Sequence, residues 1–314
     1  MKLQLLIIFN EIFFMDLTKR RWQWVVFIFL SFIWGTSFIL MKKGLESYTN
    51  HQVAAFRLLF SFIIFSPVFI TRLRKINKNN LKSLLIVGFI GNGIPAFLFT
   101  KAQTQIDSSI AGILNSLTPL FTLLIGLMFY RSQVLFINII GVFLGLLGAI
   151  GLIYKGSNDI LSNTNWYALY IVLATLCYGI SVNEIKHKLH DLDGVTIACL
   201  GFFFVGPWAG LSLLFTDFSY ALSTPDYWQN LGFIAILALF SSVIAIAIFN
   251  ILIKYTTAIF AASVTYIIPI FAIFWGVFDG EKITLNQFLW VAIILVGVYL
   301  VNKKKLVTIK YDKD

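Results

Sequence analysis

Ten stretches of this chain are each about twenty residues long, strongly apolar and almost free of charge. About 20 apolar helical residues are needed to cross the roughly 30 Å hydrocarbon core of a membrane. We therefore expect an all-α polytopic membrane protein with ten transmembrane helices. The break near Lys254 is the least distinct, and its loss would leave nine. The expected helices cover residues 22–41, 51–71, 82–100, 107–129, 134–154, 165–185, 194–215, 229–253, 256–278 and 284–302.

One segment occurs twice, as AGILNSLTPLFTLLIG at 111–126 and as AASVTYIIPIFAIFWG at 261–276. The copies lie in the fourth and ninth expected helices, which predicts two halves of five helices each. Because five is odd, the halves would insert with opposite orientations, and such an inverted repeat is a usual basis of alternating access in transporters. The expected domains are a first half at 22–154, a linker at 155–164 and a second half at 165–302.

Lysine and arginine are distributed unevenly between the two sides of this topology. The side that holds both termini carries 18 of them and the opposite connections carry 5, with Arg57 inside a helix. The positive-inside rule then predicts that both termini are cytoplasmic, with an N-terminal segment at 1–21 and a basic tail at 303–314. We also expect translation to start at Met15 rather than at Met1.

The net charge of +10 belongs to these short loops and tails, so it does not indicate a nucleic-acid partner. Charged residues make up only 12% of the chain, about half the usual share of a soluble protein. The expected partners are the lipid bilayer and a small-molecule substrate, with no nucleic acid. We expect a multi-pass protein of the cell (inner, cytoplasmic) membrane, and a monomer is the simplest assembly.

Both copies of the duplicated segment carry a proline near the middle of an expected helix. Proline cannot donate to the carbonyl four residues back, so we expect Pro119 to free the carbonyl of Asn115 and Pro269 to free that of Thr265. Such a carbonyl is tolerated in a membrane only where protein groups or cavity water satisfy it. Two broken helices in matching positions of two halves point to a central solute site, and the alternative is a packing kink.

Polar and aromatic residues recur at helical spacing on the faces that would surround such a site. For small residues such as Gly112 and Ala262, the alternative is close helix packing, whereas asparagines are costly to leave facing lipid. The candidate residues of the substrate path are Trp34, Ser37, Arg57, Asn92, Pro95, Phe99, Asn115, Pro119, Tyr178, Ser242, Asn250, Thr265, Tyr266 and Pro269.

Arg57 lies about six residues into the second expected helix, roughly 9 Å along its axis. Inserting an arginine at a helix centre costs about 2.5–3.5 kcal/mol, and less near the interface. Two interpretations stay open at this stage. The side chain snorkels to the membrane surface and fixes the helix end, or it attracts an anionic or zwitterionic solute together with Lys42 and Lys43.

The 14 acidic residues fall in termini, loops or helix ends, and Glu184 comes closest to burial. The three histidines lie at helix ends or in the connection at 186–193 and are expected to be solvated. The sequence contains no ATP-binding GxxxxGK[ST] loop and no HExxH motif. Cys177 and Cys199 lack metal-ligand spacing. We therefore expect no catalytic residues, no metal and no cofactor, and a protein that is not an enzyme.

Several segments in order resemble the EamA domain, a duplicated five-helix unit of the drug/metabolite transporter superfamily. They are WGTSF at 34–38, AAFR at 54–57, LTPLFT at 117–122 and IIPIFAIFWGVFDGEKITLNQFLWVAIILVGVYLV at 267–301. Two positions depart from the family pattern. Tyr130-Arg131 stands where the second half has the family's Gly280-Glu281, and Tyr178-Gly179 stands where Trp-Gly is usual.

The resemblance implies a secondary transporter that moves a small metabolite by alternating access. An amino acid or a related zwitterionic, neutral or anionic solute is the expected substrate, and export the expected direction. The alternatives are a non-transporting membrane scaffold or subunit, and a multidrug exporter. Exporters of lipophilic cations usually need a carboxylate within the membrane to exchange a proton for the drug, and the sequence alone shows none there.

Overall fold

A computed structural model describes residues 16–106, 108–132, 134–153, 166–278 and 285–301. The expectations for Met15, the linker at 155–164, the tail at 303–314 and Gly280-Glu281 lie outside these residues. Within the described ranges the chain is helical, without strands.

Each of the ten expected segments coincides with a helix or with a rod of consecutive helical pieces. Four long helices are continuous: α2 (Arg20–Leu45), α3 (Asn50–Leu73), α10 (Tyr167–Lys188) and α11 (Gly194–Leu213). Two rods contain a π-helical segment: α4 (Lys78–Leu85), η1 (Ile86–Gly93) and α5 (Ile94–Ala102) form one, and α13 (Tyr227–Leu237), η3 (Ala238–Ile244) and α14 (Ala245–Tyr255) form the other.

Two further rods contain a 3-10 segment, and two helices are short and unbroken. The rods are α6 (Ser108–Leu114), η2 (Asn115–Leu117) and α7 (Thr118–Phe129), and α15 (Ala258–Ala262), η4 (Ser263–Tyr266) and α16 (Ile268–Phe278). The single helices are α8 (Phe136–Ile153) and α17 (Leu285–Val301), and a short α12 (Ser219–Ser223) precedes α13. In the described residues, six rods are long and apolar enough to cross a membrane, and four shorter apolar helices accompany them. That all ten cross it stays a prediction.

The turn expected near Lys254 lies two residues further on. Thr256 is extended, with φ −126° and ψ −171°. The hydroxyl of Thr257 then caps α15 by accepting from the backbone N–H of Phe260 at 3.1 Å. An extended residue followed by an N-cap ends one helix and starts the next, although hydropathy hardly changes across the junction.

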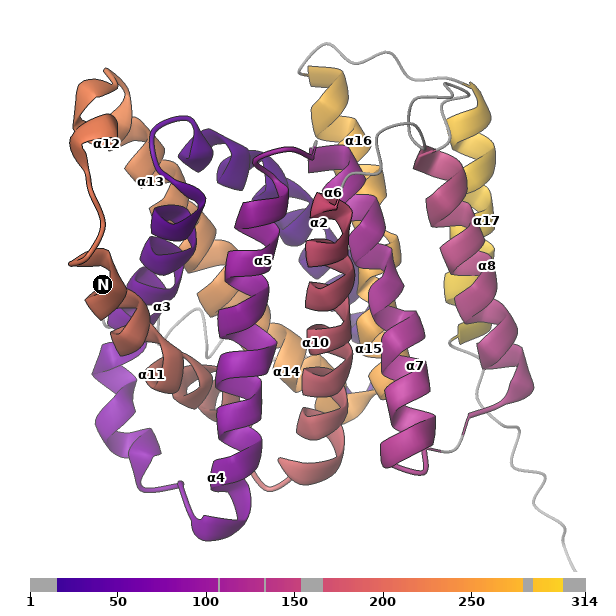
Figure 1. Ribbon diagram of the computed structural model, residues 1–314. Coiled ribbons are helices and arrows are strands. Elements are labelled where there is room, and N and C mark those ends of the chain that lie inside the picture. The colour runs from indigo at the N-terminus through magenta and orange to yellow at the C-terminus, as the bar shows by residue number, and fades with distance from the viewer. Residues whose placement is uncertain (1–15, 107, 133, 154–165, 279–284, 302–314) are drawn as a thin grey trace, which may run out of the picture.

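The rods stand side by side as a bundle, with α8 and α17 paired at its right edge in Figure 1. Glycines allow this pair to pack backbone against backbone, because a Cβ on Gly297 would lie 2.6 Å from the backbone nitrogen of Gly145. Close approach through small residues is the common way in which membrane helices associate.

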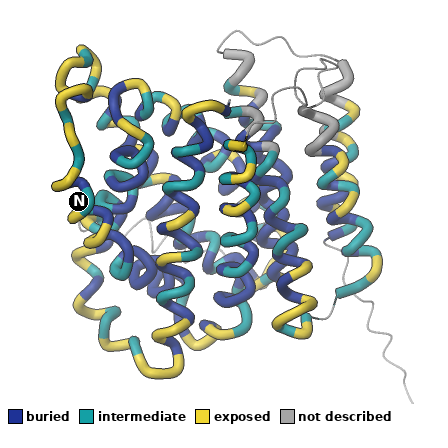
Figure 2. The backbone as a smooth tube through the Cα atoms, in the orientation of Figure 1, coloured by how far each residue is buried: buried dark blue, intermediate teal, exposed yellow. Residues whose placement is uncertain are grey.

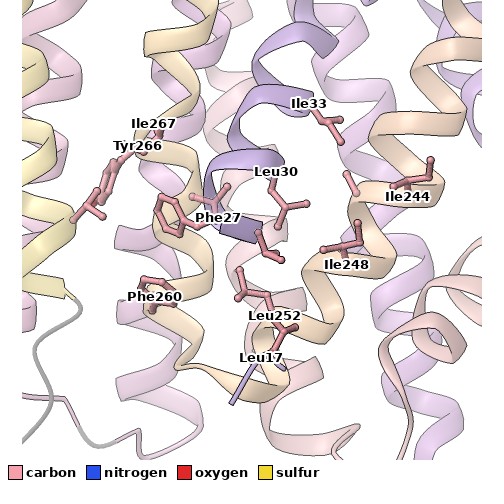
Figure 3. Packing of buried hydrophobic residues seen from close by; sticks show 14 of the residues in the cluster. Leu17, Phe27, Leu30, Ile33, Ile244, Ile248, Leu252, Phe260, Tyr266 and Ile267 are labelled. Atoms are coloured by element: carbon pink, nitrogen blue, oxygen red, sulfur yellow. The ribbon is translucent and has the colours of Figure 1, made fainter. Parts of the chain in front are cut away.

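The interior is apolar, and so is much of the outer surface. Figure 3 shows Phe27 and Leu30 of α2 beside Ile248 of α14 and Phe260 of α15, within one buried cluster. Exposed positions follow the outward faces of the helices in Figure 2, and they include large apolar side chains such as Phe136, which is 76% exposed. Apolar surface on this scale fits contact with lipid rather than with water.

Asp193, the N-cap of α11, ties this helix to the end of α3. Its carboxylate accepts from the Thr196 backbone N–H at 2.8 Å, from Arg72 at 2.9 Å and from Lys75 at 2.8 Å. Burial raises the pKa of Asp193, but the hydrogen bonds from Lys75 and Thr196 and the charge of Arg72 outweigh it and hold the pKa at about 2.

Stability should therefore depend on acid through this residue. A carboxyl whose pKa is lower in the folded state stabilises the fold above its unfolded pKa, and that contribution disappears as the pH falls from about 4 to about 2. Asp193→Asn can still cap α11 but loses the charge that binds Arg72 and Lys75, so it should lower the Tm at pH 7 by a few degrees, and by much less near pH 3. Thermal unfolding in detergent at both pH values measures this. Asp191→Asn, whose partner His190 is exposed, is the control and should change the Tm at neither pH.

Candidate functional site

A cavity of about 100 Å³ lies inside the bundle, where both halves contribute to its wall. Its lining comes from α2, α3, η1, α5, η2, α7, α10, α14 and η4. Nine of the fourteen candidate residues lie on this wall: Trp34, Ser37, Arg57, Asn92, Phe99, Asn115, Tyr178, Asn250 and Thr265. The structure thus brings together residues that are far apart in the sequence.

Five candidates lie off the wall. Ser242 is behind it and accepts a hydrogen bond from Arg57. Tyr266 points away toward α8, where its hydroxyl donates to the carbonyl of Val142 at 2.8 Å and its ring packs on Gly145. Pro95, Pro119 and Pro269 do not line the cavity either.

The prolines do not line the cavity, but they fix the backbone next to residues that do. Pro95 and Pro119 each occupy one of the first two positions of an α-helical piece, and Pro269 is the second residue of α16. Each follows a π or 3-10 segment. At such positions the missing N–H is tolerated and the fixed φ favours a new helix. The preceding π and 3-10 segments carry Asn92, Asn115 and Thr265 to the cavity.

The carbonyls four residues before the two duplicated prolines both accept hydrogen bonds from protein side chains. The carbonyl of Asn115 accepts from the hydroxyl of Thr118 at 2.8 Å, and that of Thr265 accepts from the hydroxyl of Ser116 at 3.1 Å. Of the two expected ways to satisfy these carbonyls, protein groups or cavity water, the structure shows protein hydroxyl groups at both. The Ser116 bond joins η2 of the first half to η4 of the second.

Ser116→Ala should leave the carbonyl of Thr265 buried without a partner, at a cost of about 1–3 kcal/mol in the free energy of unfolding. Adding Pro269→Ala supplies a backbone N–H four residues after Thr265, so the double variant should recover part of the lost stability. Thermal unfolding of both variants and of Pro269→Ala alone measures this. A double variant that is less stable than Ser116→Ala would contradict the assignment.

Arg57 faces the interior of the bundle. Its Nε donates to the hydroxyl of Ser242 at 2.8 Å, and its side chain lines the cavity. Among the described residues no carboxylate forms an ion pair with it. The position favours the second interpretation of the sequence over snorkelling, because the guanidinium points to the cavity. Arg57 therefore places a fixed positive charge on the cavity wall, and its other guanidinium N–H groups remain able to donate hydrogen bonds.

Asn92 adds a second donor that has no partner. Its side chain is 9% exposed, and its Nδ2 makes no hydrogen bond within the described structure. A buried donor without a partner is costly unless a ligand or water satisfies it. Asn250 differs, because its Nδ2 donates to the carbonyl of Gly194 at 3.4 Å and thereby supports α11.

Aromatic rings form the apolar part of the wall. Tyr178 stacks on Phe99 with ring centroids 5.9 Å apart, and Trp34 meets Phe249 edge to face at 5.0 Å. The indole N–H of Trp34 donates to the carbonyl of Ser241 at 3.1 Å, which fixes the ring. These contacts form a rigid surface suited to the hydrocarbon part of a small solute.

Sequence reasoning missed further wall residues, and helical spacing could have found several. Phe38 and Met41 follow Trp34 by four and seven positions, as Val182 and Ile185 follow Tyr178. Residues at this spacing share a helix face. The remaining residues that were missed are Val87, Gly91, Thr118, Ser181, Ile246 and Phe249.

Comparison with known proteins identifies the family. The EamA-like transporter family matches residues 22–154 and 165–303. The chain belongs to the EamA family. The uncharacterized inner membrane transporter YedA of Escherichia coli strain K12 is 27% identical over 88% of this chain and 89% of the relative. An uncharacterized transporter of Archaeoglobus fulgidus is 20% identical over 90% of this chain and 99% of the relative.

A solved structure, described only as a crystal structure of a protein, shares the fold of this EamA chain. It superposes with a TM-score of 0.69 at 15% identity, over 90% of this chain and 96% of the other. Taken with the apolar helices, the family shows a multi-pass membrane protein and a transporter rather than an enzyme.

Proposed function

We propose that this EamA protein is a secondary transporter that exports a small metabolite by alternating access, and that the metabolite carries a carboxylate, as amino acids do. The observation that carries the proposal is Arg57, a cation on the cavity wall with no carboxylate partner among the described residues. Arginine binds carboxylates through two parallel hydrogen bonds, and such charge-assisted bonds are strong.

The neighbouring groups suit the rest of such a solute. The side chain of Asn92 lines the cavity, and its amide group can bond a second polar group of the solute. The rings of Trp34, Phe99 and Tyr178 offer an apolar surface and π faces that also accommodate an ammonium group. In alternating access, this cavity would open to one side of the membrane at a time.

Cross-packing between the halves supports alternating access. Gly35 of α2 packs on Phe271 of α16, and a Cβ on it would lie 2.6 Å from the Phe271 Cβ. Gly179 of α10 packs on Phe121 of α7, and a Cβ on it would lie 2.9 Å from the Phe121 carbonyl carbon. Phe121 and Phe271 are matching positions of the duplicated segment. The first helix of each half thus packs on the proline-containing rod of the other half, as expected of ten helices in two inverted repeats. The excess of lysine and arginine on one side supports cytoplasmic termini for this topology.

The test is counterflow in proteoliposomes loaded in turn with amino acid, sugar, nucleoside and lipophilic-cation pools. The proposal predicts exchange of labelled amino acids or related carboxylates, and no exchange of sugars or nucleosides. Exchange of lipophilic cations alone would favour a multidrug exporter. A folded protein that exchanges none of these pools would favour a membrane scaffold.

A further inference from the structure

The rod formed by α4, η1 and α5 carries an open groove on its outward face. The groove has a volume of about 450 Å³ and is lined by residues between Lys78 and Ile90 of α4 and η1. Ser83 and Leu84 are buried on the opposite face, where Ser83 donates to the carboxylate of Glu184 at 2.7 Å. The groove therefore lies on the side of this rod that faces away from the bundle.

The lining of the groove changes character along the rod. Lys78 and Lys82, one helical turn apart, form its cationic end, and both are exposed. The other lining residues continue the same helical face and are apolar: Leu81, Leu85, Ile86, Phe89 and Ile90. A cationic end followed by an apolar stripe complements an anionic phospholipid, which has a charged headgroup followed by acyl chains.

The length of the groove matches one leaflet of a membrane. From Lys78 to Ile90 the chain advances 12 residues, which is roughly 15–18 Å at about 1.5 Å per residue. Half of the roughly 30 Å hydrocarbon core is about 15 Å. A lipid whose phosphate meets the lysines would therefore lay its acyl chains along Leu85 and Phe89 within one leaflet. A soluble phosphate compound would leave this apolar stripe uncovered.

Protein carboxylates do not neutralise the cationic end of the groove. Five of the residues 72–82 are lysine or arginine, and residues 47–106 contain no aspartate or glutamate. The carboxylate of Asp193 is bound by two other cations of this stretch. Lys78 and Lys82 form no ion pair within the described structure. Their ammonium groups are therefore available to an anion.

Other basic side chains at this end of the bundle have partners of their own. The Nζ of Lys186 donates to the carbonyls of Ile253 at 2.9 Å and Lys254 at 3.1 Å. His187, expected in solvent, instead stacks on the Tyr130 ring at 5.1 Å. This engagement distinguishes them from the two lysines of the groove.

Hydrogen bonds fix the start of α4, which presents these lysines. The side chain of Asn77 accepts from the backbone N–H groups of Asn79 and Asn80, both at 3.0 Å. The Nδ2 of Asn80 donates to the carbonyl of Lys75 at 2.9 Å. Such a capping box holds the first turn of a helix in place, so little backbone ordering is needed when a lipid binds.

We propose that this outward face is a binding site for one anionic phospholipid, with the phosphate between Lys78 and Lys82 and the acyl chains along the apolar stripe. The lysine and arginine distribution puts this end of the bundle in the cytoplasmic leaflet, to which anionic lipids give a negative surface potential. The inference does not depend on which solute the protein moves. Because η1 also carries Asn92 to the central cavity, the lipid would contact a rod that forms part of the cavity wall.

Native mass spectrometry of the purified, delipidated protein in a neutral detergent tests the site. Phosphatidylglycerol and phosphatidylcholine with the same acyl chains are titrated, and the Kd of the first bound lipid is measured. Phosphatidylglycerol should bind at least about tenfold more tightly. Lys78→Gln combined with Lys82→Gln should weaken its binding by about 20- to 30-fold, because each lysine contributes about fivefold. Binding of phosphatidylcholine should not change.

Matched variants and a soluble competitor separate this site from general attraction of charge. Lys19→Gln combined with Lys188→Gln removes the same charge from exposed positions elsewhere and should change the Kd for phosphatidylglycerol by less than about twofold. Phe89→Ala should weaken both lipids by a few-fold, because the ring no longer covers an acyl chain. Glycerol 3-phosphate, which has the phosphate but no acyl chains, should not displace the lipid.

Four results would overturn the proposal. They are equal binding of the two lipids, an equal loss of phosphatidylglycerol binding in the Lys19 and Lys188 control, and unchanged binding of both lipids in Phe89→Ala. The fourth is displacement by glycerol 3-phosphate, which would indicate a soluble phosphate ligand instead.

Discussion

Replacing Arg57 by glutamine is expected to lower carboxylate transport by about 10- to 100-fold while the protein still folds. A hydrogen bond to a charged group contributes about 1.5–3 kcal/mol, and one with a carboxylate substrate would be lost here. Glutamine can still donate to Ser242, which Arg57 contacts at 2.8 Å, so the wall keeps its local bond. Initial rates of counterflow at substrate concentrations below the KM, with Tm as the measure of folding, give the result.

Two companion variants separate charge from geometry. Arg57→Lys keeps the charge but loses the planar fork, so its rate should fall between those of the parent and Arg57→Gln. Ser242→Ala leaves the guanidinium in place and should reduce transport only a few-fold. Carboxylate transport that is unchanged in Arg57→Gln would remove Arg57 from the binding site.

Replacing Gly179 by alanine should lower the Tm by roughly 2–12 °C, and Gly35→Ala should have a similar effect. A Cβ at position 179 would lie 2.9 Å from the carbonyl carbon of Phe121 and 3.0 Å from the nitrogen of Thr122. Both are backbone atoms, so α7 and α10 must separate. Such overpacking costs about 1–3 kcal/mol, and transport should slow because these contacts join the two halves.

The control for this prediction is Gly232→Ala in α13. A Cβ there would meet nothing within 4 Å, and alanine is a better helix former by about 0.5–1 kcal/mol. Its Tm should stay unchanged or rise slightly. If Gly179→Ala and Gly232→Ala had equal Tm values, the cross-packing would not hold the halves together.

The helices were predictable because their signal is local. Runs of about twenty apolar residues marked the positions of the helices, and helical spacing from Trp34 and Tyr178 marked the faces that line the cavity. Spacing within one helix says nothing about its neighbours. The bond from Arg57 to Ser242 spans 185 residues, and only the packing of α3 against η3 brings them together.

Two features could not be predicted from the sequence, because each depends on contacts between different helices. Glu184 was expected near a helix end, but its burial depends on Ser83 and Tyr130 from other helices. The prolines were expected to free carbonyls that protein groups or water satisfy, but the sequence could not show that the donor to Thr265 is the hydroxyl of Ser116, one helix away. Tyr130 stands where the second half has a glycine, and this departure from the family pattern was the available signal for the hydrogen bond from Tyr130 to Glu184.

Labelling the two copies of one position tests most directly the claim that the halves are inverted around a shared site. Positions 131 and 281 correspond in the duplicated sequence. Single cysteines, Arg131→Cys and Glu281→Cys, should react with an impermeant thiol reagent from opposite sides of intact membrane vesicles. The account predicts position 131 on the cytoplasmic side and position 281 on the other. Labelling of both from the same side would contradict it.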